Sequence, residues 1–158
     1  MQAKAISGYN AGATGTGVTA AVIDSGVAQS SSEFAGRIHP ASADLAGTRG
    51  IADEDGHGTA VSDVLLGAKN DSGIHGVAFG ATLLVARTDT PGSCTNPDPA
   101  KDCSHDDNAI ARGVDLAVAN NARVINISLG GSPPNATLRA ALDRATAAGI
   151  VIVFSAGN

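Results

Sequence analysis

The sequence predicts an α/β protein, built on an open parallel sheet with helices on both faces and incomplete at the C-terminus. Short apolar runs rich in Val, Ile and Leu alternate with helical patterns along the 158 residues. Apolar residues make up 43% of the chain and charged residues only 16%, which favours a packed core over a disordered chain. Strands that alternate with helices indicate a parallel sheet joined by right-handed crossovers.

Four apolar runs are the expected strands, because each is short, continuous and bounded by turn residues. In chain order they are Val18–Ile23, Leu83–Ala86, Val124–Ile127 and Ile150–Phe154. No linker, repeat or low-complexity run divides the chain, so residues 1–158 are expected to belong to one domain. The last run has no helical pattern after it, which predicts a fragment of a longer domain.

Three helical patterns lie between these runs. The first follows His57 and stops at Gly67, with an inward face formed by Val61, Val64 and Leu65. The second begins near Asp106 and Asp107, whose carboxylates suit a helix N-terminus. The third is Asn135–Ala147, whose apolar face is formed by Leu138, Ala141, Leu142 and Ala145.

Charge and hydropathy exclude two classes of partner. The chain has 10 Lys and Arg against 15 Asp and Glu, a net charge of −5, whereas a nucleic-acid-binding domain normally carries a basic stripe. No apolar run approaches the length of a membrane span. The residues after Met1 do not form the apolar stretch of a signal peptide, so any export signal is expected to lie outside this chain.

Two cysteines, Cys94 and Cys103, share one polar stretch, and no second pair is present to complete a zinc site. A local disulfide is the simplest use of such a pair, although two free thiols remain the alternative. The disulfide would stabilise the fold by about 2.7 kcal/mol on the chain-entropy model. It would also place the protein in an oxidising compartment.

Ligands of open α/β sheets bind outside the carboxyl ends of the strands, so the residues that follow each run are the candidate site. Asp24 ends an apolar run and needs a buried partner. His57 begins a helix between two glycines, which let other groups approach its imidazole closely. Asn158 follows the last run, where its amide could donate to a developing oxyanion. Each has a purely structural reading when taken alone.

Four segments stand in a fixed order along the chain: Asp24-Ser25-Gly26, Gly56-His57-Gly58-Thr59, Ser128-Leu129-Gly130-Gly131 and Ser155-Ala156-Gly157-Asn158. In order and spacing, from about Gly12 onward, they resemble the motifs of the subtilisin-like serine proteases. The resemblance implies a subtilisin-like fold, with Asp24 as the triad acid, His57 as the general base and Asn158 as the oxyanion-hole donor. It also implies a backbone segment that pairs with an extended substrate, formed by Ser128, Leu129, Gly130 and Gly131.

Thr88–Asp106 takes the place of the opposite substrate-binding edge. Here this edge is lengthened and carries both cysteines, a feature that resembles subtilases of the bacterial autotransporter kind. The remaining histidines, His39, His75 and His105, have no motif around them and are interpreted as surface residues.

The nucleophile of the family stands in a Gly-Thr-Ser motif, and none of the three Gly-Thr pairs in this chain is followed by Ser. Residues 1–158 are therefore interpreted as the N-terminal portion of a subtilase catalytic domain without its serine-bearing segment. We predict that this chain alone is inactive and that the full-length protein cleaves protein or peptide substrates. The alternative is a non-catalytic, subtilase-like peptide-binding module that has lost the serine.

The resemblance has further implications for cofactors and location. No cofactor is required for the chemistry, but Ala68–Ile74 resembles a calcium-binding loop, which implies a structural calcium at Glu33 and Asn70. An inhibitory pro-segment and a secreted or cell-surface location are also implied. Two other readings are weaker. Gly12–Gly17 precedes a strand, unlike a nucleotide-binding loop. A metal hydrolase using Asp24, Asp53, Asp55 and His57 would leave the later motifs unexplained.

Overall fold

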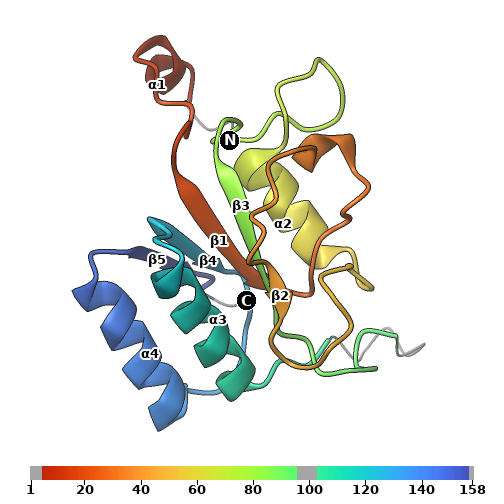
Figure 1. Cartoon of the computed structure of the whole chain (residues 1–158), viewed down its shortest axis with the longest axis vertical. Helices are drawn as coiled ribbons and strands as arrows, with labels where there is room; N and C mark the ends of the chain where they lie inside the picture. Colours follow the sequence, from red (N-terminus) through yellow and green to blue (C-terminus); the bar gives the residue numbers. More distant parts are fainter. Residues whose placement is uncertain (1–4, 96–102, 157–158) are drawn as a thin grey trace.

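The structure, a computed structural model, describes residues 5–95 and 103–156. Within these residues, five strands form one parallel sheet with the spatial order β2-β3-β1-β4-β5 (Figure 1). The strands are β1 (Thr19–Asp24), β2 (Ala43–Asp44), β3 (Thr82–Arg87), β4 (Val124–Ile127) and β5 (Val151–Phe154). The central strand β1 therefore lies between β3 and β4.

Helices cover both faces of the sheet, as the sequence predicts. Helix α2 (His57–Leu66) lies on one face, and helices α3 (Asp107–Ala119) and α4 (Ala136–Ala147) lie on the other (Figure 1). A short helix α1 (Ile6–Asn10) precedes the sheet, and a 3-10 turn η1 (Ser32–Phe34) packs against α2. None of the helices in the described ranges is long and apolar enough to cross a membrane.

The core consists of two apolar layers, one on each side of β1. Residues 20–24 of β1 are all buried, because the strand has covered neighbours on both edges and both faces. Small side chains allow the layers to come close. A Cβ atom added at Gly113 of α3 would lie only 3.1 Å from the Ala86 Cβ atom and 3.3 Å from the Ile23 Cδ1 atom.

Polar residues cap the N-termini of α3 and α4, at the places where the sequence predicted that helices begin. Asp106 caps α3 by accepting hydrogen bonds from the Asn108 and Ala109 amides, and Asn135 caps α4 by accepting one from the Leu138 amide. The sequence did not predict α1, η1 or the two-residue strand β2. These elements are too short to show an apolar period.

The topology places several loops at one edge of the sheet. After β3 the chain crosses over to β4, on the other side of β1, so the strand order reverses beside the carboxyl end of β1. Asp24 is the last residue of β1 and pairs in register with Arg87 of β3. Open α/β sheets bind ligands at such a reversal.

Candidate active site

Asp24 and His57 form a hydrogen-bonded pair at this reversal. The Asp24 Oδ1 atom lies 2.8 Å from the His57 Nδ1 atom. The Asp24 side chain is only 1% exposed, whereas the His57 side chain is 48% exposed. The carboxylate also accepts a hydrogen bond from the Ser25 amide at 2.8 Å. A buried acid therefore holds one nitrogen of the imidazole, while much of the ring faces solvent.

The hydrogen bond from Asp24 raises the pKa of His57 above its usual value. Burial opposes this shift, and the negative charges of Asp24, Asp55 and Asp53 add to it. A carboxylate favours the imidazolium form because it stabilises the positive charge. The pair can thus accept a proton on the imidazole and hold the resulting cation.

Asp53 fixes the start of α2, from which His57 projects. One of its oxygens accepts hydrogen bonds from the Ser25 hydroxyl (2.9 Å) and the Gly56 amide (2.8 Å), and the other accepts two from Thr59. Burial alone would raise the pKa of Asp53, but these hydrogen bonds outweigh it and lower the pKa. Sequence analysis had considered Asp53 only as a metal ligand.

Glycine at position 58 lets α2 approach β1 closely enough for the pair to form. A Cβ atom at this position would lie 2.4 Å from the Gly26 carbonyl oxygen and 3.2 Å from the Asp24 Cβ atom. The Gly58 amide donates to the Ser25 hydroxyl at 3.0 Å. The glycine beside the histidine is therefore needed for packing as well as for access.

A groove of about 800 Å³ lies beyond β4, and three of the four residues expected to bind substrate line it. These are Leu129, Gly130 and Gly131. The two glycines are open, since a Cβ atom on either would meet no atom within 4 Å. Ser128 does not line the groove, and its hydroxyl accepts a hydrogen bond from the Asn126 amide group at 2.9 Å.

The segment after β3 folds back on itself and brings His105 to the groove. Asp89 and His105 make an antiparallel bridge, and the Thr90 amide donates to the Ser104 carbonyl at 2.8 Å. Cys94 and Cys103 form the expected disulfide, with 4.4 Å between their Cα atoms. His105, interpreted from the sequence as a surface residue, is instead partly buried, and its ring is hydrogen-bonded with Thr88 and lines the groove.

A buried ionic cluster lies at the carboxyl ends of β2 and β3, and the sequence analysis did not anticipate it. Arg87 donates to Asp89 from Nε (2.7 Å) and Nη2 (3.0 Å), and Arg49 bonds to both Asp89 (2.8 Å) and Asp44 (2.9 Å). Glu54 lies 3.0 Å from Arg87. The cluster joins the loop that contains Asp53 to the end of β3.

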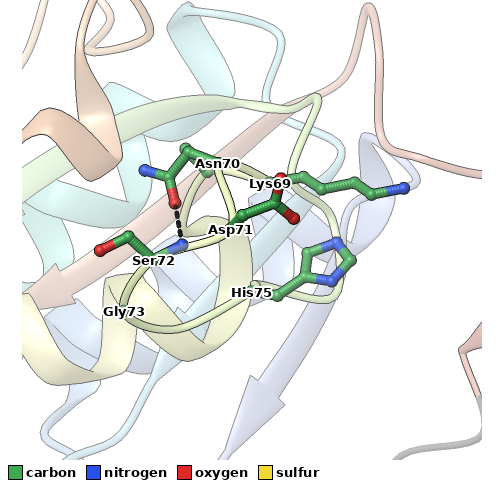
Figure 2. Close-up of a pocket in the computed structure, with 7 residues that line it drawn as sticks. Lys69, Asn70, Asp71, Ser72, Gly73 and His75 are labelled. Atoms are coloured by element: carbon green, nitrogen blue, oxygen red, sulfur yellow. Dashed lines mark hydrogen bonds between the residues drawn. The ribbon is translucent and has the colours of Figure 1, made fainter.

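Glu33 and Asn70, the expected calcium ligands, lie next to one another. The Glu33 carboxylate accepts hydrogen bonds from the Ala68 amide (2.9 Å) and from the Asn70 side chain (3.3 Å). Figure 2 shows the loop that contains Asn70, where the Asn70 Oδ1 atom accepts a hydrogen bond from the Ser72 amide at 3.1 Å. Within residues 5–95 and 103–156, no three His, Cys, Asp or Glu side chains form a metal-binding group.

Asn158 lies outside the described residues, so its expected role stays a prediction. The described geometry pairs a buried acid with a half-exposed imidazole. Such a pair has the arrangement of a general base and the acid that orients it. The model of the subtilase family matches residues 15–158, and the chain therefore belongs to that family.

Curated relatives support the same assignment. Subtilisin E of Bacillus subtilis is 34% identical over 99% of this chain and 38% of its own length. Subtilisin BL of Lederbergia lenta is 32% identical over 98% of this chain and 53% of its own length. A thermostable alkaline protease of Halalkalibacterium halodurans is 32% identical over 95% of this chain and 38% of its own length. The chain thus spans between about a third and a half of the relatives it matches.

Proposed function

We propose that this chain provides the acid and the base of a serine endopeptidase. The observation that carries the proposal is the 2.8 Å contact between the Asp24 Oδ1 and His57 Nδ1 atoms, in which the acid is buried and the imidazole is half exposed. Membership of the subtilase family and similarity to proteins named as proteases support it. Extended peptides or proteins are the proposed substrates, since residues 129–131 line an open groove.

In the proposed mechanism Asp24 keeps the proton on the Nδ1 atom of His57, which leaves Nε2 free as the base. His57 takes the proton of the nucleophile and later returns it to the leaving amine. Asp24 stabilises the imidazolium that forms in between. The Asn158 amide would donate to the oxyanion, and residues 128–131 would align the substrate backbone.

We place the nucleophile outside these 158 residues, because no Gly-Thr-Ser occurs in the sequence. Residues 1–158 are then the N-terminal portion of the catalytic domain, and this portion alone does not hydrolyse peptides by the triad route. The disulfide supports a secreted or cell-surface location, because such bonds persist in oxidising compartments. An inhibitory pro-segment is part of the same proposal and rests on membership of the family alone. The long, disulfide-closed loop supports the bacterial autotransporter kind of subtilase.

We also propose a structural calcium ion at Glu33 and Asn70. The donor set fits this hard cation, because a carboxylate and a side-chain amide meet at a loop with several backbone carbonyls. Calcium binding would require the Asn70 side chain to turn its oxygen toward the Glu33 carboxylate and to give up its hydrogen bond with the Ser72 amide. Calcium bound there would hold η1 against the loop after α2 and would take no part in the chemistry.

Fluorophosphonate labelling with peptide mapping tests the proposed activity. Full-length protein should be labelled at a serine beyond Asn158, the full-length His57→Ala variant should lose most of the labelling, and the 158-residue chain should stay unlabelled. Amidase turnover by the purified 158-residue chain would contradict the placement of the nucleophile. If full-length protein neither labels nor cleaves but binds extended peptides, the peptide-binding module replaces the protease.

A further inference from the structure

His105 holds a position in the groove that the proposed mechanism does not use. Its backbone forms an antiparallel bridge with Asp89, and it lines the same groove as Leu129 and Gly130. The ring is held by one hydrogen bond, between its Nδ1 atom and the Thr88 hydroxyl at 3.0 Å. Its Nε2 atom has no hydrogen-bond partner among residues 5–95 and 103–156.

Thr88 decides which nitrogen of His105 carries the proton. Thr88 is completely buried, and its hydroxyl has no hydrogen-bond partner other than His105 within the described part of the chain. A buried hydroxyl hydrogen without an acceptor is costly, so the hydroxyl donates to Nδ1. The neutral ring must then carry its proton on Nε2, which makes that atom a donor.

The surroundings of His105 keep it neutral. Burial lowers the pKa of His105; the negative charges of Asp24, Asp89 and Asp55 act in the opposite direction, and the neighbouring His57 again lowers it. Protonation of Nδ1 would also force the Thr88 hydroxyl hydrogen away from its only acceptor. His105 is therefore a neutral N–H donor rather than a cation at neutral pH.

The other residues that line the groove determine which kind of substrate side chain could bind next to the Nε2–H group of His105. Apolar side chains form much of the lining, namely Ile110, Ile127, Leu129, Leu138 and Leu142. Asp107 adds a negative charge to the same lining, which disfavours an acidic guest. A basic side chain of the substrate would bring a second hydrogen-bond donor to His105, rather than an acceptor. An apolar ring with a neutral oxygen at its tip satisfies both the lining and the donor.

We propose that His105 is a specificity-determining residue, whose Nε2–H group donates to the phenolic oxygen of a substrate tyrosine. This proposal rests on the proposed protease function, because it assigns the groove to an extended peptide. A phenylalanine in the same place would leave the donor without an acceptor. One neutral hydrogen bond should give tyrosine an advantage of roughly two- to tenfold.

Matched peptides and variants test this role. Peptides that differ only in Tyr or Phe are compared at each of the four positions before the cleaved bond, with kcat/KM of full-length protein as the readout. His105→Gln keeps an amide nitrogen about as far from the backbone as Nε2, so it should retain the preference. His105→Asn places its nitrogen only as far as Nδ1 and should lose it. Thr88→Val keeps the shape of the side chain but removes the hydroxyl that donates to the His105 Nδ1 atom. The Nε2–H tautomer is then no longer favoured, and the preference for Tyr over Phe should fall.

Nitrogen NMR of His105 adds a direct readout, since the Nε2–H tautomer should dominate in wild type and lose its dominance in Thr88→Val.

Equal kcat/KM for Tyr and Phe at all four positions, or an unchanged preference in His105→Asn, would overturn the proposal. If His105→Asn does not fold, the Thr88→Val variant is used instead, and an unchanged preference for Tyr over Phe in that variant would overturn the proposal. If the protein neither labels with fluorophosphonate nor cleaves peptides, the protease function fails. Tighter binding of Tyr than Phe peptides that disappears in the variants would then still support His105, and equal binding would overturn it.

Discussion

Asp53 offers the sharpest test of how the fold positions His57. Its carboxylate accepts hydrogen bonds from Ser25, Asp55, Gly56 and Thr59, which join the end of β1 to the first turn of α2. The substitution Asp53→Asn keeps the size of the side chain but replaces one oxygen with an NH₂ group. That group cannot accept the hydrogen bonds that the lost oxygen received.

The expected loss in the free energy of unfolding follows from the number of hydrogen bonds that Asp53→Asn removes. If the remaining oxygen faces Ser25 and Gly56, the NH₂ group meets the two donors of Thr59. Hydrogen bonds to a charged group contribute about 1.5 kcal/mol each at the lower end, so the free energy of unfolding should fall by about 3 kcal/mol. Displacement of His57 should also lower kcat/KM by about tenfold or more.

Urea unfolding of full-length Asp53→Asn beside wild type measures the first effect. Asp143→Asn is the matched control, because Asp143 is exposed and makes no hydrogen bond or ion pair within the described ranges. It should change the free energy of unfolding by less than about 0.5 kcal/mol. Asp53→Asn with a loss equally small would refute the role assigned to Asp53.

The contribution of Asp53 to the free energy of unfolding should depend on pH. The pKa of Asp53 is lowered in the folded protein, so its contribution to stability is present above the unfolded value of about 3.9. The contribution is lost as pH falls through the lower folded pKa. The difference between wild type and Asp53→Asn should therefore shrink below about pH 4, and a constant difference would point to a cause other than the carboxylate charge.

Three further predictions concern the ionic cluster, the base and the calcium loop. Arg87→Met should lower the free energy of unfolding by about 3–5 kcal/mol, because Asp89 is left buried with one cation fewer; a loss below about 1 kcal/mol in urea unfolding would contradict this. In full-length protein, kcat/KM should fall as pH drops through the raised pKa of His57, and Asp24→Asn should move that acid limb to lower pH. An unmoved limb would exclude the pair as its origin. Calcium at 100 times its Kd should stabilise the protein by about 2.7 kcal/mol, and Glu33→Gln should abolish most of the Tm rise. A Tm that responds to neither calcium nor chelator would contradict the site.

The sequence was sufficient to predict the framework of the sheet. Val124–Ile127 coincides with β4, and Val18–Ile23 covers β1 except for its last residue, Asp24, because a strand buried on both faces is largely apolar. Strand β2 escaped prediction because Ala43–Asp44 carries no such signal. Its position is set by pairing with Ala86 and Arg87 of β3, a contact between segments far apart in the chain.

The candidate site was predicted in part. Asp24 and His57 could be paired from motif order, and the structure brings them together. Thr88 and His105 could not be paired, since they are 17 positions apart and their contact depends on the bridge that folds the segment after β3 back on itself. A polar residue directly after a buried strand was the available signal for Thr88. Nothing in the sequence around His105 indicated that its ring would turn inward.

The ionic cluster also bears on why Asp24 pairs with His57. Arg87 is the register partner of Asp24 on the adjacent strand, and its guanidinium is buried. A buried guanidinium needs anionic partners, because an unpaired buried charge is strongly destabilising. Asp89 and Glu54 bind this guanidinium. Because Asp89 follows Arg87 by two positions in the same chain, the compensation is built in locally, and the Asp24 carboxylate remains available to the imidazole.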